Sequence, residues 1–234
     1  MIPVNEPLIS KNALRYVTDC LKTGWISSAG KYLKEFEKNF AEFLEIKHAI
    51  TTTSGTTALH LALLTLGIKK GDEVILPSHT MMSSAAAIVY TGATPVLVDV
   101  ERDSWNMNVS QIEKKINKRT KAIMPVHIYG HSVDMDPIIA LAKKYHLYII
   151  EDAAESTGAE YKRKLTGTLG DIGCFSFYAN KIITTGEGGM MVTNNDKIAN
   201  HARLLKDMAH STKKRFLHKE IGFNFRMTNL QAAL

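Results

Sequence analysis

Apolar residues recur at helical spacing near the N-terminus and then gather in short runs along the chain. Leucine and phenylalanine recur every three or four positions between Leu33 and Leu44, which predicts an amphipathic helix that ends near Glu45. Further on, strand-like runs at 49–53, 73–77, 95–99, 121–125, 147–152, 174–177 and 189–193 alternate with predicted helices at 58–66, 83–90, 109–116, 137–145 and 196–208. Such alternation predicts an α/β fold, with a mainly parallel sheet flanked by helices on both faces.

Polar residues follow several of the predicted strands. In an open parallel sheet, ligands bind beyond the carboxyl ends of the strands. The strand ends carry Ser54-Gly55-Thr56, Pro77–Thr80, His127–Gly130, Glu151-Asp152 and Ser176–Lys181. We therefore expect these groups to face one crevice.

The segment Ser54-Gly55-Thr56 connects a strand directly to a helix. Free N–H groups and the positive end of the helix dipole would lie together there and could hold a phosphate. An ordinary helix cap explains the same residues, and the segment alone does not decide between the two readings. No P-loop or dinucleotide-binding glycine pattern is present in the chain.

Asp152 and Lys181 add a buried acid and an amine to this edge. Asp152 ends an apolar strand, where it is either a salt-bridge partner or a functional anion. Lys181 follows another strand and precedes a glycine-rich segment, where it is either a surface lysine or a Schiff-base former. Together with the possible phosphate cradle, the two residues match what pyridoxal 5'-phosphate requires.

Six motifs in order then resemble one known family. They are Gly24–Ser28, Thr53–Leu59, Glu151–Ala154, Ser176–Lys181, Thr185–Met190 and Gly222–Ala233. The chain resembles the sugar-nucleotide aminotransferases of the DegT/DnrJ/EryC1/StrS type, which have the aspartate aminotransferase-like fold type I. The resemblance covers essentially the whole chain and is greatest to the 4-aminotransferases.

The resemblance implies specific roles for these residues. Lys181 would form the bond to pyridoxal 5'-phosphate, and Asp152 would face its pyridine nitrogen. The other expected cofactor-binding residues are Ser54, Gly55, Thr56, Met81, Glu155, Ser176 and Asn224, with Asn224 reaching the site of a neighbouring subunit. Many relatives have glutamine at Glu155 and an aromatic residue at Met81. No metal site is expected.

The resemblance also implies a reaction. Glutamate would donate its amino group to a nucleotide-linked 4-keto-6-deoxyhexose, with GDP as the preferred nucleotide, for polysaccharide biosynthesis such as that of O-antigen. The enzyme would be a homodimer with shared active sites. Two alternatives remain open: a dehydratase, which has histidine in place of Lys181, and a non-catalytic or inactive truncated paralogue that binds the cofactor or a partner without turnover.

Composition narrows the other possibilities. The 234 residues include 29 Lys+Arg and 23 Asp+Glu, a net charge of +6, and the basic residues are scattered except at Lys213–Arg215, so no nucleic-acid partner is expected. No long apolar stretch, no signal-like N-terminus and only two cysteines predict a cytoplasmic protein that does not enter a membrane. Family members continue past the helix in which this chain ends at Leu234. We therefore expect 1–234 to be a large cofactor-binding domain with an N-terminal helical segment, without the small C-terminal domain.

Overall fold

A seven-stranded sheet forms the centre of the computed structural model, which describes residues 2, 5–211 and 216–234. The strands are β1 (His48–Thr52), β2 (Glu73–Pro77), β3 (Thr94–Val98), β4 (Thr120–Ile123), β5 (Tyr148–Asp152), β8 (Ile172–Ser176) and β9 (Gly189–Thr193). Their order across the sheet is β1-β9-β8-β5-β4-β2-β3. Neighbours from β8 through β3 are parallel, whereas β9 runs antiparallel to both β1 and β8. The predicted mainly parallel sheet is confirmed.

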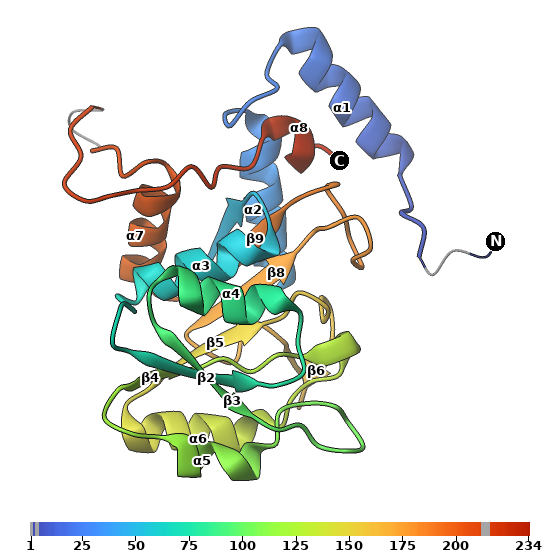
Figure 1. Ribbon diagram of the computed structural model, residues 1–234. Coiled ribbons are helices and arrows are strands. Elements are labelled where there is room, and N and C mark those ends of the chain that lie inside the picture. The colour runs from blue at the N-terminus through green and yellow to red at the C-terminus, as the bar shows by residue number, and fades with distance from the viewer. Residues whose placement is uncertain (1, 3–4, 212–215) are drawn as a thin grey trace.

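Helices cover both faces of this sheet. The helices are α1 (Lys11–Thr23), α2 (Lys31–Phe43), α3 (Gly55–Thr65), α4 (Met82–Tyr90), α5 (Ile112–Lys115), α6 (Met135–Tyr145), α7 (Asp196–Lys206) and α8 (Asn229–Ala232), with the short 3-10 turns η1 (Val109–Gln111) and η2 (Ile128–Gly130). Helices α3, α4 and α7 pack on one face, and α2, α5 and α6 pack on the other. Figure 1 shows α3 and α4 across the strands from α5 and α6.

Strand alternation produces the two apolar layers. Val74 and Leu76 of β2 are buried in the α3 and α4 layer, whereas Ile75 between them is buried in the α5 and α6 layer. Successive side chains of a strand point to opposite faces, so an uninterrupted apolar run fills both layers. This packing fixes the strand ends and the groups that follow them.

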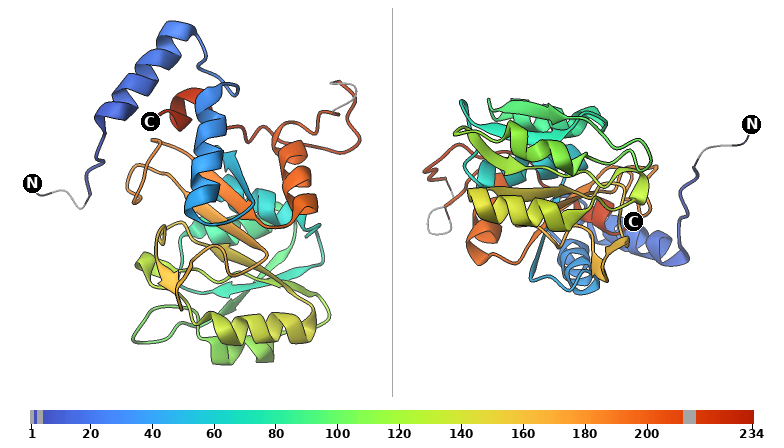
Figure 2. Two further views of the ribbon diagram at one scale, coloured as in Figure 1. Left: turned by 180° about the vertical axis from the view of Figure 1, so that it is seen from behind. Right: turned by 90° about the horizontal axis from the view of Figure 1, so that it is seen from below.

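Helix α1 was not predicted from the sequence. Ser10 caps its first turn, and Gly24 ends it in the left-handed region at φ 75°. The apolar residues of this helix recur at helical spacing along one side, where Ala13 and Cys20 are buried and Leu14 and Leu21 are exposed. The helix stands away from the sheet beside α8 (Figure 2).

Several smaller features also differ from the prediction. The helix expected at 109–116 is a 3-10 turn followed by the four-residue α5. A two-stranded hairpin, β6 (Glu160–Tyr161) with β7 (Lys164–Leu165), was not predicted. The basic cluster Lys213–Arg215 lies outside the described residues. Within the described ranges, no helix combines the length and apolarity needed to cross a membrane.

Candidate active site

A crevice of about 400 Å³ opens where the strands of the sheet end. Eight of the nine predicted site residues line it: Ser54, Gly55, Thr56, Met81, Asp152, Glu155, Ser176 and Lys181. They come from four separate segments of the chain, which the sheet order brings to one edge. The ninth residue, Asn224, is not among the lining residues and accepts a hydrogen bond from Arg226 Nε at 3.0 Å.

The N-terminus of α3 forms one wall of the crevice. The Ser54 hydroxyl accepts a hydrogen bond from the backbone N–H of Thr57 at 3.2 Å, and the Thr57 hydroxyl accepts one from the N–H of Ser54 at 3.0 Å. This reciprocal pair is a capping box, so the helix-cap interpretation of Ser54 is correct. The capping box does not use the N–H groups of Gly55 and Thr56. These two groups have no partner within the helix and lie beside the crevice.

Gly55 allows this wall to lie close to the end of β8. A Cβ atom on Gly55 would be 2.8 Å from the Cβ of Ser176, closer than side-chain atoms pack. Glycine therefore lets the helix N-terminus and the Ser176 hydroxyl meet in the same part of the crevice. An anion bound there would meet the positive end of the helix dipole.

Asp152 lies at the buried side of the crevice. Asp152 is only 4% exposed, and burial raises the pKa of its carboxyl above the ordinary value of 3.8. Hydrogen bonds from the Ser84 hydroxyl at 2.7 Å and the Ala154 N–H at 3.2 Å oppose part of this increase. A cation placed against the carboxylate would favour its charged form.

Lys181 reaches the same crevice from the segment after β8. Its Nζ donates a hydrogen bond to Glu155 Oε1 at 3.0 Å, and the two side chains are 15% and 20% exposed. The other oxygen of Glu155 accepts a hydrogen bond from the backbone N–H of Tyr129 at 2.9 Å. Glu155 therefore connects the lysine to the turn η2.

Met81 occupies the opening of the crevice. It is the N-cap residue of α4, it makes no side-chain cap, and it is 62% exposed. Nearby, the ring of His79 lies between those of Trp105 and Tyr129, with centroid separations of 5.3 and 5.9 Å. The predicted strand ends contain His79 and Tyr129, whereas Trp105 lies outside them and was not expected here.

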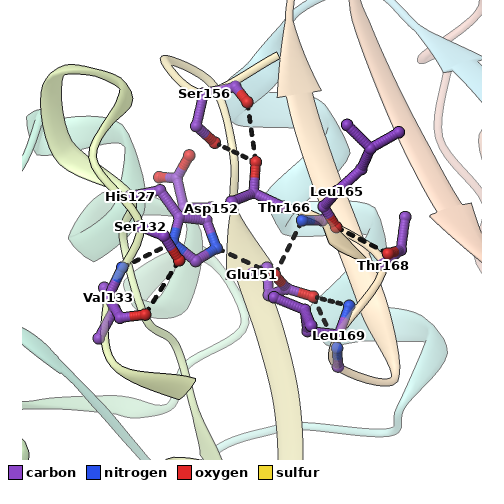
Figure 3. A network of polar contacts seen from close by, with 12 residues as sticks. His127, Ser132, Val133, Glu151, Asp152, Ser156, Leu165, Thr166, Thr168 and Leu169 are labelled. Carbon is purple, nitrogen blue, oxygen red and sulfur yellow. Dashed lines mark hydrogen bonds and ion pairs between the residues drawn. The ribbon is translucent and has the colours of Figure 1, made fainter. Parts of the chain in front are cut away.

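A buried network supports the strand that carries Asp152 (Figure 3). Glu151 is fully buried and accepts hydrogen bonds from His127 Nε2 at 2.9 Å and from three backbone N–H groups. These three donors are Gly167, Leu169 and Gly170, at 2.8, 2.7 and 2.6 Å. Because the N–H of Val133 donates to His127 Nδ1, the ring proton lies on Nε2. Glu151 thus fixes the end of β5, while its neighbour Asp152 points to the crevice.

A larger cavity of about 850 Å³ lies elsewhere, among α1, α2 and α7. Its buried charges neutralise one another: Lys206 Nζ lies 3.2 Å from Glu37 Oε1 and donates to the Thr51 carbonyl oxygen at 2.9 Å. Burial lowers the pKa of Lys206, whose amine contacts Glu37 and two oxygens of Thr51. We therefore place the chemistry in the smaller crevice, where a lysine and an acid face open space.

The arrangement defines a class of protein. An α/β sheet with a helix N-terminus, a buried acid and a lysine at one edge is the arrangement of the large domain of fold type I transferases. The match to a family profile extends over residues 7–234, and its description is the DegT/DnrJ/EryC1/StrS aminotransferase family. The chain belongs to this family.

Individual relatives support the same assignment. The chain is 52% identical over 233 residues to GDP-perosamine synthase of Caulobacter vibrioides, a match that covers 100% of this chain and 63% of that protein. It is 50% identical to GDP-perosamine synthase of Escherichia coli O157:H7, covering 100% of this chain and 64% of that protein. The chain thus spans slightly less than two thirds of the length of these relatives.

Solved structures agree in fold. An aminotransferase from Psychrobacter cryohalolentis has a TM-score of 0.91 and 38% identity, covering 97% of this chain and 60% of that one. The pyridoxal phosphate form of a sugar aminotransferase, Spr1654 of Streptococcus pneumoniae, has a TM-score of 0.91 and 28% identity, covering 99% of this chain and 64% of that one.

Aminotransferases of this family use pyridoxal 5'-phosphate, and the crevice fits that group. The close approach at Gly55 leaves a helix N-terminus free for a phosphate. The buried Asp152 carboxyl gains from a cation such as a protonated pyridine. The amine of Lys181 lies in the same crevice as both.

Proposed function

We propose that this protein is a pyridoxal phosphate-dependent aminotransferase that moves an amino group from glutamate to a nucleotide-linked 4-keto-6-deoxyhexose. The observation that carries the proposal is the convergence of Lys181, Asp152 and the N-terminus of α3 on one crevice. The similarity to two GDP-perosamine synthases favours GDP as the nucleotide and C4 as the aminated carbon. The product would serve polysaccharide biosynthesis.

Each residue has a distinct task in the proposed reaction. The bound cofactor supplies an aldehyde that accepts the amino group and a ring that withdraws electrons. The N–H groups of Gly55 and Thr56, with the hydroxyl of Ser176, bind the phosphate and orient the ring. Asp152 holds a proton on the pyridine nitrogen through an ion pair in a site with little water.

Lys181 has two tasks. Its Nζ would hold the cofactor by a bond to the aldehyde carbon, whose oxygen would leave as water, and would so keep the ring in place. Once the amino donor displaces it, the free amine moves a proton away from the substrate carbon and returns one at the end of the transfer. A dehydratase would need histidine at this position, so Lys181 favours transamination.

The test combines cofactor attachment with product formation. The protein is incubated with pyridoxal 5'-phosphate, reduced with borohydride and digested, and the modified lysine is identified by mass. Lys181 should carry the cofactor, and Lys181→Ala should lose both this adduct and the amino-sugar product formed from glutamate and a panel of 4-keto-6-deoxy sugar nucleotides. Lys197→Ala, an exposed change in α7, is the matched control. Attachment to a different lysine would contradict the assignment.

We also propose that the enzyme is a homodimer whose subunits share their active sites. Asn224 lies outside the crevice of its own chain but belongs to a motif that resembles a phosphate-binding segment. In an isologous dimer, each subunit could lend this residue to the other. Mixing inactive Lys181→Ala subunits with impaired Asn224→Ala subunits should then restore activity, because one site of the mixed dimer contains both native residues. Proven subunit exchange without any gain would contradict the shared site.

A further inference from the structure

We propose that Glu155 is a positioning residue that holds the amine of Lys181 whenever this lysine is not bonded to the cofactor, a role that rests on the proposed function. The carboxylate lies between two donors. Oε1 is 3.0 Å from Lys181 Nζ, and Oε2 is 2.9 Å from the backbone nitrogen of Tyr129. One oxygen is therefore anchored to the main chain, while the other is available to a side chain that must move.

The anchor is a constrained part of the backbone. Tyr129 has φ 52°, in the left-handed region that non-glycine residues rarely adopt. This conformation aims its N–H at Glu155, and residues held in such conformations gather at functional sites. The carboxylate can therefore stay in place when Lys181 leaves.

Other acidic residues do not compete for this role. Asp152 and Glu187 also line the crevice, but Asp152 already accepts hydrogen bonds from Ser84 and Ala154. Glu187 is exposed, and the described residues include no hydrogen-bond partner for its side chain. Glu155 is thus the carboxylate within hydrogen-bond distance of Lys181.

The ion pair has opposite effects on two steps. The hydrogen bond to Glu155 Oε1 occupies the amine of Lys181, and this contact must open before the nitrogen can attack an aldehyde. Glu155 should therefore slow the attachment of Lys181 to the cofactor. It should also give the displaced lysine a fixed position from which it returns.

The experiment measures the reactivity of Lys181 in the cofactor-free protein. The change Glu155→Gln keeps an oxygen for the Tyr129 N–H but removes the charge. The protein is labelled with acetic anhydride between pH 6 and 10, and the modification of each lysine is read by mass. We expect Lys181 to be labelled about two- to fivefold faster near neutral pH in the variant, the factor that a partly exposed ion pair supports. Lys197 is the internal standard.

Two controls make the outcome decisive. Glu187→Gln removes a charge from the same crevice and should leave the labelling of Lys181 unchanged. Circular dichroism checks the fold, and Glu155→Ala serves as a second variant if Glu155→Gln does not fold. An unchanged rate of Lys181 labelling in a folded Glu155 variant would overturn the proposal. If Glu155 had a purely structural role, its replacement would change the stability of the protein but not the rate at which Lys181 is labelled. Because the assay contains no cofactor or substrate, its failure is separable from failure of the proposed function.

Discussion

Replacing Asn229 by alanine removes a cap from a helix that lies far away in the sequence. The N-cap residue of α2 is Gly30, which has no side chain that could accept a hydrogen bond from the first N–H groups of the helix. Instead, Asn229 Oδ1 accepts hydrogen bonds from the N–H groups of Tyr32 and Leu33 at 3.0 and 3.3 Å. Its Nδ2 donates to the Trp25 carbonyl oxygen at 2.7 Å. Asn229 is only 1% exposed, so water cannot replace these partners.

The expected loss of stability follows from these contacts. Loss of a helix cap costs about 0.5–2 kcal/mol. The hydrogen bond to the Trp25 carbonyl contributes about 0.5–1.5 kcal/mol more. We count nothing for the contact with the Cys20 thiol, which is a weak hydrogen-bonding group. Asn229→Ala should therefore lower the free energy of unfolding by about 2 kcal/mol, near the middle of the summed range.

Urea unfolding followed by circular dichroism measures this loss. Asn195→Ala is the matched control, because Asn195 caps its own helix, α7, through the N–H groups of Lys197 and Ile198 on the surface. That change should cost only about 1 kcal/mol. An Asn229→Ala protein that loses no more than the Asn195→Ala protein would refute the reasoning.

A double-mutant cycle tests the packing beside the same side chain. A Cβ atom on Gly30 would lie 2.3 Å from Asn229, and Gly30 has φ 148°. Gly30→Ala should thus be destabilising through both a clash and backbone strain. In the Asn229→Ala background the clash is relieved while the strain remains, so the second cost should be smaller than the first. Strictly additive costs would show that the two residues do not interact.

Three further outcomes are expected. Asp152→Asn should stabilise the cofactor-free protein at neutral pH. Burial raises the pKa of Asp152 above 3.8 in the folded protein, so the wild type loses stability as the pH rises from the unfolded pKa to the folded pKa. Thermal unfolding from pH 4 to 8 measures the difference, and a variant less stable than the wild type at neutral pH would contradict the prediction. Gly55→Ala should weaken pyridoxal 5'-phosphate binding about tenfold in a fluorescence titration, since its Cβ would lie 2.8 Å from Ser176 Cβ. Cys20 and Cys174 are free and buried, and burial raises both thiol pKa values, that of Cys174 well above 9.0, so a thiol reagent should modify them only as the protein unfolds.

The sequence predicted the fold where local patterns decide structure. Short apolar runs such as Glu73–Pro77 and Gly189–Thr193 became strands with the predicted bounds. The N-terminal helix α1 was missed, although Ala13, Val17 and Cys20 recur at helical spacing and the sequence therefore carried a signal for it. Its position depends on α8, which lies two hundred residues further along the chain.

The sequence by itself determined which groups could reach the crevice, because parallel strands place their carboxyl ends at one edge. It also pointed to a candidate acid and a candidate amine, since Asp152 ends one strand and Lys181 follows another. Only the tertiary structure decided their partners. Ser84 lies 68 positions from Asp152, Glu155 lies 26 positions from Lys181, and Asn229 lies 197 positions from Tyr32. A hydrogen bond requires atoms within about 3 Å, and separation along the chain does not specify that distance until the sheet and its helices have packed.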